Sequence, residues 1–312
     1  MDSLDMLNDP LAIPEIDEVE TCPAPGPEAV LADERTTPTP EAPDAGEASE
    51  PTSLCVAFRG ANGGAGVTSL AIETAHAFAQ AKRGEVCLVD LDFSLGMCAH
   101  YLDLPIRPEL GDFQTDPGRV DANYVRAMLT EHSAGFSVLG SPGMMGGNDA
   151  VNPACVLAVL DHVAERFPIV VMDVPRLSRP WTEAALRAAD RTCIVTELSI
   201  PALHVTRERL KELQSWGVPN ADVIVSKMER RSFKASIRIP DAERALGQEV
   251  LETIGLDIHS PLEAMNCGEP VGRIAGESAY AKDCARIART LAPQLAERRR
   301  RRSPWGRFAR GK

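Results

Sequence analysis

The sequence predicts an α/β protein built on a doubly wound, mostly parallel sheet with helices on both faces. From residue 54 onward, short runs rich in Val, Ile and Leu alternate with longer stretches of helical periodicity, as expected when crossover helices join parallel strands. Each short run is apolar throughout, which indicates strands buried on both faces. A chain of 312 residues with 44% hydrophobic residues can bury one such core and carry terminal segments besides.

Six strands and eight helices follow from this alternation, and a seventh strand is left open. The predicted strands comprise residues 54–58, 86–90, 136–139, 169–173, 192–196 and 223–226, with the open seventh at 250–254. The predicted helices comprise residues 67–82, 121–129, 153–165, 181–189, 201–216, 241–247, 261–267 and 278–296.

Charge divides the chain into three parts. Residues 1–52 carry fourteen acidic side chains, one Arg and nine prolines, so they cannot bury enough apolar surface to offset the entropy of ordering. Residues 298–312 carry eight basic side chains and no acidic one. We therefore expect a disordered acidic, proline-rich arm over 1–52, a folded domain over 53–297 and a basic, aromatic-containing tail over 298–312. The apolar patch from Met6 to Ile13 is either a docking motif or part of a solvated arm.

The cysteines and the N-terminus indicate where the protein resides. Eight cysteines are scattered without any CxxC pair, and several lie inside apolar runs, as reduced core thiols of a cytosolic protein do. The N-terminus is acidic where a signal peptide would be basic, and no apolar stretch approaches the length of a membrane span. We expect a cytoplasmic protein that is at most peripheral to a membrane.

A glycine-rich loop joins the first predicted strand to the first predicted helix. Residues 60–69 read Gly-Ala-Asn-Gly-Gly-Ala-Gly-Val-Thr-Ser, which has the glycines and the hydroxyl of a phosphate-binding loop but no lysine. Main-chain N–H groups at a helix N-terminus suit phosphate oxygens, and the hydroxyl suits magnesium. The alternative is an ordinary glycine turn. The predicted cofactor-binding residues of the loop are Asn62, Gly63, Gly64, Ala65, Gly66, Val67, Thr68 and Ser69.

Acidic residues end two of the predicted strands. Asp90 and Asp92 end the second strand, and Asp173 ends an apolar run in the manner of a Walker B segment. Open α/β sheets bind ligands at the carboxyl ends of their strands, so these acids are expected near the loop. Thr68, Asp90 and Asp173 are the predicted magnesium ligands, and Asp92 is the predicted catalytic residue that orients the attacking water. The alternatives are that Asp90 only caps a loop and that Asp92 is only solvated.

Together these motifs resemble the MinD/ParA class of P-loop ATPases, whose deviant loop reads K-G-G-x-G-K-[ST] and whose second motif reads D-x-D. The resemblance extends over about residues 54–292 and narrows to the pilus-assembly branch, CpaE/TadZ, through several further segments. These are Val-Asp-Leu-Asp-Phe-Ser-Leu-Gly at 89–96, Tyr-Leu-Asp-Leu at 101–104, Asp-Val-Pro at 173–175 with Pro-Trp-Thr at 180–182, Ala-Ala-Asp at 188–190, Glu-Arg-Arg at 229–231 and Asp-Ala-Glu-Arg-Ala-Leu-Gly at 241–247.

The resemblance implies a MinD/ParA-like P-loop fold with ATP and Mg²⁺ as cofactors. It also implies a homodimer that helps to place and assemble a type IV pilus of the tight-adherence (Flp) kind, at the inner membrane or a cell pole, with pilus or secretion-machinery proteins as partners. Ser226 and Lys227 stand where related ATPases often have Asn-Lys beside the base, so both are predicted to bind the cofactor.

Both loop lysines of the class are missing from this chain. Asn62 stands for the lysine that reaches across the dimer, and Val67 stands for the second lysine. Losing one charged hydrogen bond costs about 1.5–3 kcal/mol, or about ten- to a hundredfold in affinity. Arg59 or Lys82 could substitute, although their positions give this little support. We expect ATP binding through main-chain amides with weak or absent hydrolysis.

Three alternatives remain open for the function. The pocket could be empty in a dimerising scaffold, the protein could be an active ATPase with an ATP-gated dimer switch, or it could be a ParA-like DNA-segregation ATPase.

The tail at 298–312 also has more than one interpretation. Its cations, together with Trp305 and Phe308, suit an anionic membrane surface. Nucleic-acid binding is the less favoured rival, and a solvated tail is the third reading.

Overall fold

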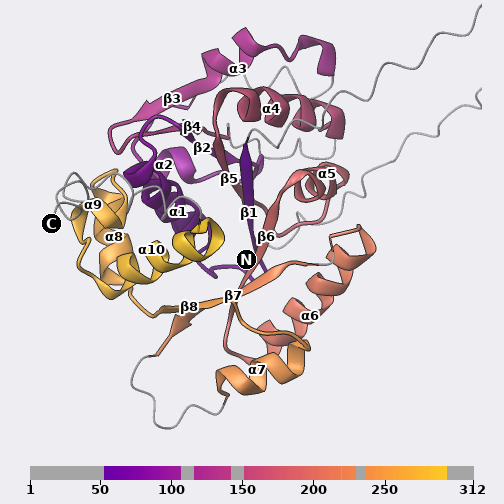
Figure 1. The fold of residues 1–312 in the computed structure, drawn as a ribbon, viewed down its shortest axis with the longest axis vertical. Coiled ribbons are helices and arrows are strands. Elements are labelled where there is room, and N and C mark those ends of the chain that lie inside the picture. The colour runs from indigo at the N-terminus through magenta and orange to yellow at the C-terminus, as the bar shows by residue number, and fades with distance from the viewer. Residues whose placement is uncertain (1–52, 107–115, 142–150, 219, 230–236, 294–312) are drawn as a thin grey trace, which may run out of the picture. The chain divides into compact units, whose positions relative to one another are not determined.

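The computed structural model describes residues 53–106, 116–141, 151–218, 220–229 and 237–293, and the elements given below lie within these ranges (Figure 1). The strands form one sheet in the order β3-β4-β2-β5-β1-β6-β7-β8. Every neighbouring pair is parallel except β3 and β4. The strands are β1 (Leu54–Gly60), β2 (Val86–Asp90), β3 (Leu129–His132), β4 (Phe136–Leu139), β5 (Ile169–Val174), β6 (Arg191–Glu197), β7 (Asp222–Met228) and β8 (Glu252–Gly255). The predicted fold class is therefore confirmed.

Helices cover both faces of the sheet. The helical elements are α1 (Val67–Ala81), α2 (Cys98–Tyr101), η2 (Pro117–Arg119), α3 (Ala122–Met128), α4 (Pro153–Arg166), α5 (Pro180–Ala188), α6 (Ile200–Ser215), α7 (Ile239–Leu246), α8 (His259–Asn266), α9 (Val271–Ile274) and α10 (Ala279–Leu291). Figure 1 shows α1, α8, α9 and α10 on one side of the central strands and α4 and α5 on the other. Residues of α1 and α10 share one core cluster, and residues of α4 and α5 share the second.

Strand β1 illustrates why the inner positions of the strands are apolar. Val56 and Phe58 pack into the core cluster of α1, whereas Ala57 between them packs into the cluster of α4 and α5. Successive side chains of a strand point to opposite faces, so the inner positions of a strand with helices on both sides are apolar on both faces. Each large apolar side chain buried in this way contributes about 1.5–3 kcal/mol.

Three element predictions change in the structure. The helix predicted to end at residue 129 ends one residue earlier, and Leu129 instead begins β3, which pairs antiparallel with β4. Gly135, with a φ of 98°, makes the tight turn between these two strands possible. The strand left open at 250–254 exists as β8, although it begins at Glu252. Helix α10 ends at Leu291, and residues 294–296 of the predicted helix lie outside the described residues.

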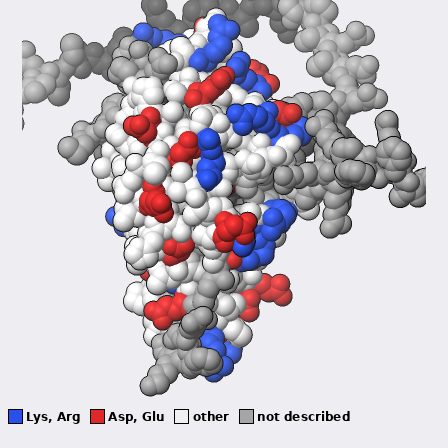
Figure 2. Space-filling view, turned by 90° about the vertical axis from the view of Figure 1, so that its left-hand side faces the viewer, with Lys and Arg blue, Asp and Glu red and all other residues white. Residues whose placement is uncertain are grey.

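The described residues also bear on membrane and nucleic-acid contacts. Within these ranges, no helix is both long enough and apolar enough to cross a membrane. Acidic and basic side chains are interspersed on the face shown in Figure 2, so that face offers no broad basic patch of described residues for a nucleic acid. The predicted arm at 1–52 and tail at 298–312 lie outside the described residues.

Candidate nucleotide site

The loop between β1 and α1 leaves main-chain amides without side-chain partners. Gly64 and Gly66 have φ values of 76° and 83°, a region that glycine adopts without strain. Helix α1 begins at Val67, and Gly66 before it makes no side-chain cap to the first turn. These residues border a pocket of about 390 Å³, a volume typical of small-molecule sites. The N-terminus of α1 therefore borders a pocket into which a phosphate group could fit.

Two uncharged side chains occupy the positions of the missing lysines. A methyl carbon of Val67 lies 3.0 Å from where a Cβ on Gly60 would stand, so the valine packs over the end of β1. The Asn62 side chain donates to the carbonyl oxygen of Gly63 at 3.2 Å, a bond within the loop itself. Neither residue supplies charge, and the pocket stays open with the valine in place.

The two cations that the sequence offered as substitutes lie elsewhere. The Arg59 side chain is buried and donates to Glu212 Oε2 at 3.1 Å and to Ser178 Oγ at 2.7 Å. Lys82 forms an ion pair with Glu85. Neither Arg59 nor Lys82 lines the pocket, so the suggestion that one of them replaces a loop lysine is wrong.

Beneath the loop, Asp90 and Asp173 are register partners on the adjacent strands β2 and β5. The Thr68 hydroxyl donates to Asp173 Oδ2 at 2.6 Å. Asp90 accepts the backbone N–H groups of Asp92 and Cys98, each at 3.0 Å. Both carboxyl groups are buried, and no Lys or Arg in the described ranges forms an ion pair with either one. The β2–β5 pairing thus brings two acids from distant parts of the sequence next to the loop hydroxyl.

Burial sets the protonation of this acid pair. It raises the pKa of Asp90 to about 8, and the charge of Asp173 adds to this effect. Burial also raises the pKa of Asp173 to about 6, although hydrogen bonds from Thr68 and Cys98 oppose the shift. The pair therefore shares a proton near neutral pH unless a cation lies beside it.

The donor atoms of this cluster fit magnesium. Thr68, Asp90 and Asp173 offer hydroxyl and carboxylate oxygens, which Mg²⁺ prefers. Their assignment as ligands stays a prediction, but the structure does bring the three together. The Cys98 thiol lies close to both acids. The ligand atoms of Asp90, Cys98 and Asp173 all lie within 4.8 Å of one another, and the thiol donates to Asp173 Oδ2 at 3.6 Å. A soft thiol is a poor magnesium ligand, so we interpret Cys98 as a hydrogen-bond donor to the acid.

Asp92 lies half-buried at the edge of the same pocket. Its Oδ1 atom accepts the backbone N–H groups of Ser94 and Leu95 at 3.1 and 3.0 Å, which fixes the turn after β2. Asp92 therefore combines a capping role with a position at the pocket, and its predicted part in orienting water stays a prediction.

Ser226 and Lys227 at the end of β7 each contact other residues of the protein. Ser226 is buried, and its hydroxyl lies 2.8 Å from the carbonyl oxygen of Ala65 and 3.1 Å from that of Thr196. The serine hydroxyl thus links the loop to β6, and its predicted contact with the base stays a prediction. Lys227 has a φ of 55° and pairs with Glu197 at 2.8 Å.

The sequence reasoning missed a charged residue of the pocket. Arg176 follows the Asp-Val-Pro segment at the end of β5 and lines the pocket beside the loop. Its position three residues after a strand-ending acid is a sequence signal that could have found it. However, only the pairing of β1 with β5 shows that this position lies beside the loop.

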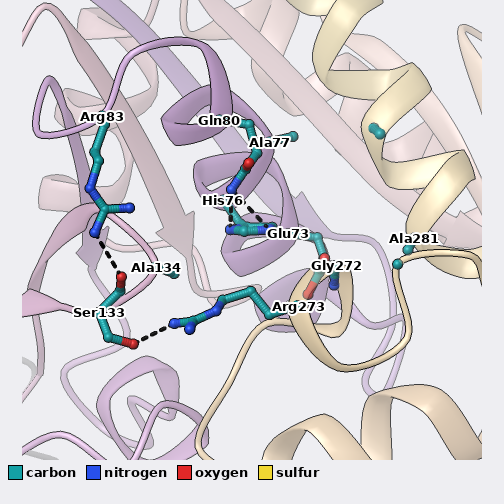
Figure 3. A pocket seen from close by; sticks show the side chains of 12 residues that line it. Glu73, His76, Ala77, Gln80, Arg83, Ser133, Ala134, Gly272, Arg273 and Ala281 are labelled. Atoms are coloured by element: carbon teal, nitrogen blue, oxygen red, sulfur yellow. Dashed lines mark hydrogen bonds between the residues drawn. The ribbon is translucent and has the colours of Figure 1, made fainter.

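A larger cavity of about 550 Å³ lies between α1, α9, α10 and the β3–β4 turn (Figure 3). Its polar groups mostly bond to one another. Arg83 and Arg273 both donate to Ser133, and Glu73 accepts the backbone N–H groups of Val271 and Gly272. No glycine of the β1–α1 loop lines this cavity, nor does Asp90 or Asp173. The smaller pocket is therefore the candidate phosphate site.

The sheet order, the loop between β1 and α1, and the acids ending β2 and β5 together define a P-loop fold of the MinD/ParA kind. No protein-family model matches the chain. The chain is similar to the septum site-determining protein MinD of Thermotoga maritima, with 23% identity over 235 residues, which span 73% of this chain and 84% of that protein.

Solved structures support the same fold. A ParA family ATPase from Chlorobium tepidum TLS superposes with a TM-score of 0.69 at 21% identity, over 77% of this chain and 98% of that one. MinD complexed with Mg-ADP from Pyrococcus horikoshii OT3 superposes with a TM-score of 0.66 at 16% identity, over 81% and 99%. The MinC:MinD complex of Aquifex aeolicus gives a TM-score of 0.65 at 18% identity, over 78% and 96%. At sequence identities this low, the superpositions show a shared fold alone.

Proposed function

We propose that this chain binds Mg-ATP in the pocket beside the β1–α1 loop and hydrolyses it slowly or not at all. The observation that carries the proposal is an open glycine loop whose Thr68 donates to Asp173, one of two adjacent buried acids, the other being Asp90. The similar MinD structure from Pyrococcus horikoshii OT3 is a complex with Mg-ADP, which supports a nucleotide and magnesium as the ligands of this pocket.

Each part of the pocket has a distinct task in this proposal. The amides of residues 63–68 hold phosphate oxygens, and Thr68, Asp90 and Asp173 hold the cation. Magnesium, when bound, neutralises charge on the phosphates. Asp92 orients a water molecule at the pocket edge.

Slow turnover follows from the charge that the loop lacks. Phosphoryl transfer depends on positive charge against the transferring group, and a single well-placed cation is worth about 10³–10⁵ in rate. Val67 offers only methyl groups, packed toward Gly60, and Asn62 bonds within the loop. The affinity for nucleotide falls less than the rate of hydrolysis, because main-chain amides still hold the phosphates of the ground state.

In the cell, we propose a CpaE/TadZ-like factor that places and assembles a tight-adherence type IV pilus, working as a homodimer in the cytoplasm or peripherally at the inner membrane or pole. The branch motifs at 89–96, 173–182 and 241–247 support this role. Three exposed apolar side chains follow β2, β5 and β6 at the carboxyl edge of the sheet, and they support a protein contact there. They are Leu95, Leu177 and Ile200, exposed by 67%, 51% and 74%.

Titration calorimetry with ATP and magnesium, together with a phosphate-release assay, tests the biochemical part. We expect wild type to bind Mg-ATP with little phosphate release, and Thr68→Ala to bind at least about tenfold more weakly because it loses a hydroxyl beside the charged cluster. Thr130→Ala on β3 is the matched control and should bind as wild type does.

Three results would contradict the proposal. Absence of Mg-ATP binding by wild type would leave a scaffold with an empty pocket. Rapid phosphate release would instead indicate the active-ATPase alternative, and Val67→Lys should then add little to the rate. DNA binding that falls steeply with salt and disappears on deletion of residues 298–312 would favour the segregation alternative.

A further inference from the structure

A cation from another strand lies against the glycines of the loop. A methyl group placed on Gly63 would stand 3.9 Å from Nη1 of Arg176, which lies beyond the end of β5. Arg176 also lines the same pocket as the loop. The candidate phosphate site therefore has a positive charge nearby, even though both loop lysines are missing.

The backbone of Arg176 is held in place from the neighbouring strand. Arg59 of β1 donates through Nη2 to the Arg176 carbonyl oxygen at 3.0 Å and to Ser178 Oγ at 2.7 Å. Arg59 is fully buried and is also paired with Glu212 at 3.1 Å. Pro175 further restricts the chain just before the arginine. These contacts fix the segment after β5 next to the loop and leave the Arg176 side chain to project from it.

The Arg176 guanidinium is not paired within the described part of the chain. It forms no hydrogen bond or ion pair with any side chain of the described ranges, and it is exposed. Among the described residues that line the pocket it is the only cation, whereas Asp92 and Asp173 are acids. A phosphate entering this pocket would meet net negative charge without the arginine. An arginine also bonds phosphate in a bidentate manner, which suits a group that approaches from the side of the loop.

Lys227 provides a useful comparison. A methyl group on Gly64 would stand 3.8 Å from its Nζ atom, so it too lies near the loop. However, Lys227 is paired with Glu197 at 2.8 Å and does not line the pocket. Its charge is largely offset by that carboxylate, which makes Arg176 the better candidate.

We propose that Arg176 binds the terminal phosphates of the nucleotide and so replaces, from the end of β5, the charge that the loop lacks. This inference rests on the proposed function, because it assigns a residue to the phosphates of that same ligand.

The test compares Mg-ATP affinity by titration calorimetry for wild type, Arg176→Gln, Arg176→Lys and the control Arg187→Gln. Arg187 is an exposed arginine of α5 paired with Glu183. We expect Arg176→Gln to weaken binding about ten- to a hundredfold, Arg176→Lys to recover part of the loss, and Arg187→Gln to match wild type. Lys227→Gln should have a smaller effect than Arg176→Gln.

Melting temperatures without nucleotide separate a binding effect from unfolding, and Arg176→Gln should melt with wild type because its side chain is exposed. If wild type binds Mg-ATP and Arg176→Gln binds equally well, the role of Arg176 is refuted while the proposed function stands. If wild type itself does not bind, the proposed function fails first.

Discussion

The substitution Gly96→Ala tests whether the acid cluster needs a tightly packed turn after β2. A Cβ at this position would lie 2.3 Å from Ser141 Cβ, 2.8 Å from Asp90 Oδ2 and 2.9 Å from the backbone oxygen of Asp92. Heavy atoms do not approach this closely, and one of the three belongs to the main chain, so the turn must move. The φ of Gly96 is not in the left-handed region, so the cost is one of packing.

Overpacking of this kind costs about 1–3 kcal/mol. For a domain of this size, each kcal/mol lowers the melting temperature by about 2–4 °C, so Gly96→Ala should melt about 2–12 °C below wild type. Because Asp90 Oδ2 is one of the atoms displaced, Mg-ATP binding should weaken as well. Circular dichroism melts and titration calorimetry measure the two effects.

Gly118→Ala is the matched control for this change. Its added Cβ would meet only Asp116 Oδ1, at 3.2 Å, and that atom is the end of a side chain that can rotate away. The control should therefore melt within about 2 °C of wild type, as most surface substitutions do. Equal melting temperatures for Gly96→Ala and Gly118→Ala would refute the argument that Asp90 is held by close packing.

Two further predictions concern the loop support and the larger cavity. Ser226→Ala removes the hydroxyl that donates to Ala65 O and should lower the free energy of unfolding by about 1–3 kcal/mol. Urea titrations measure this change, and an unchanged midpoint would show that the hydrogen bond does not support the loop. Burial raises the pKa of Glu73 from 4.5 to about 7 and lowers that of His76 from 6.5 to about 4, so rising pH removes stability through Glu73 and adds it through His76. In Glu73→Gln the contribution of Glu73 is absent, so the slope of its free energy of unfolding against pH should be more positive than that of wild type by up to about 1.4 kcal/mol per pH unit between pH 4.5 and 7, whereas parallel profiles would contradict the raised pKa of Glu73.

The sequence predicts those parts of the molecule that depend on local pattern. Unbroken apolar runs gave most of the strands, and the glycine loop was placed at the start of α1 where the structure has it. Strand β3 was missed because Leu-Thr-Glu-His is short and polar at an edge of the sheet, and it follows α3 with no intervening turn signal.

The side chains that depend on strand order could not be predicted in this way. Arg176 reaches the loop because β5 lies beside β1, although it follows Gly63 by 113 positions in the sequence. Ser226 Oγ lies 2.8 Å from Ala65 O because β7 pairs with β6, and this support for the loop could not be foreseen, whereas the predicted cofactor contact of Ser226 stays a prediction. Spacing along one chain carries no information about which strands become neighbours.

The acid pair argues against the reading in which this fold is only a scaffold. Asp90 and Asp173 are buried side by side without a cation among the described residues, and burial raises the pKa of both. Such a pair destabilises a fold at neutral pH, since amides or apolar residues of similar size would avoid the desolvation of charge. A cation bound together with a polyphosphate would remove that cost, and an arginine at the loop would hold the phosphates. The acid pair thus supports the proposal of a ligand that carries a divalent cation.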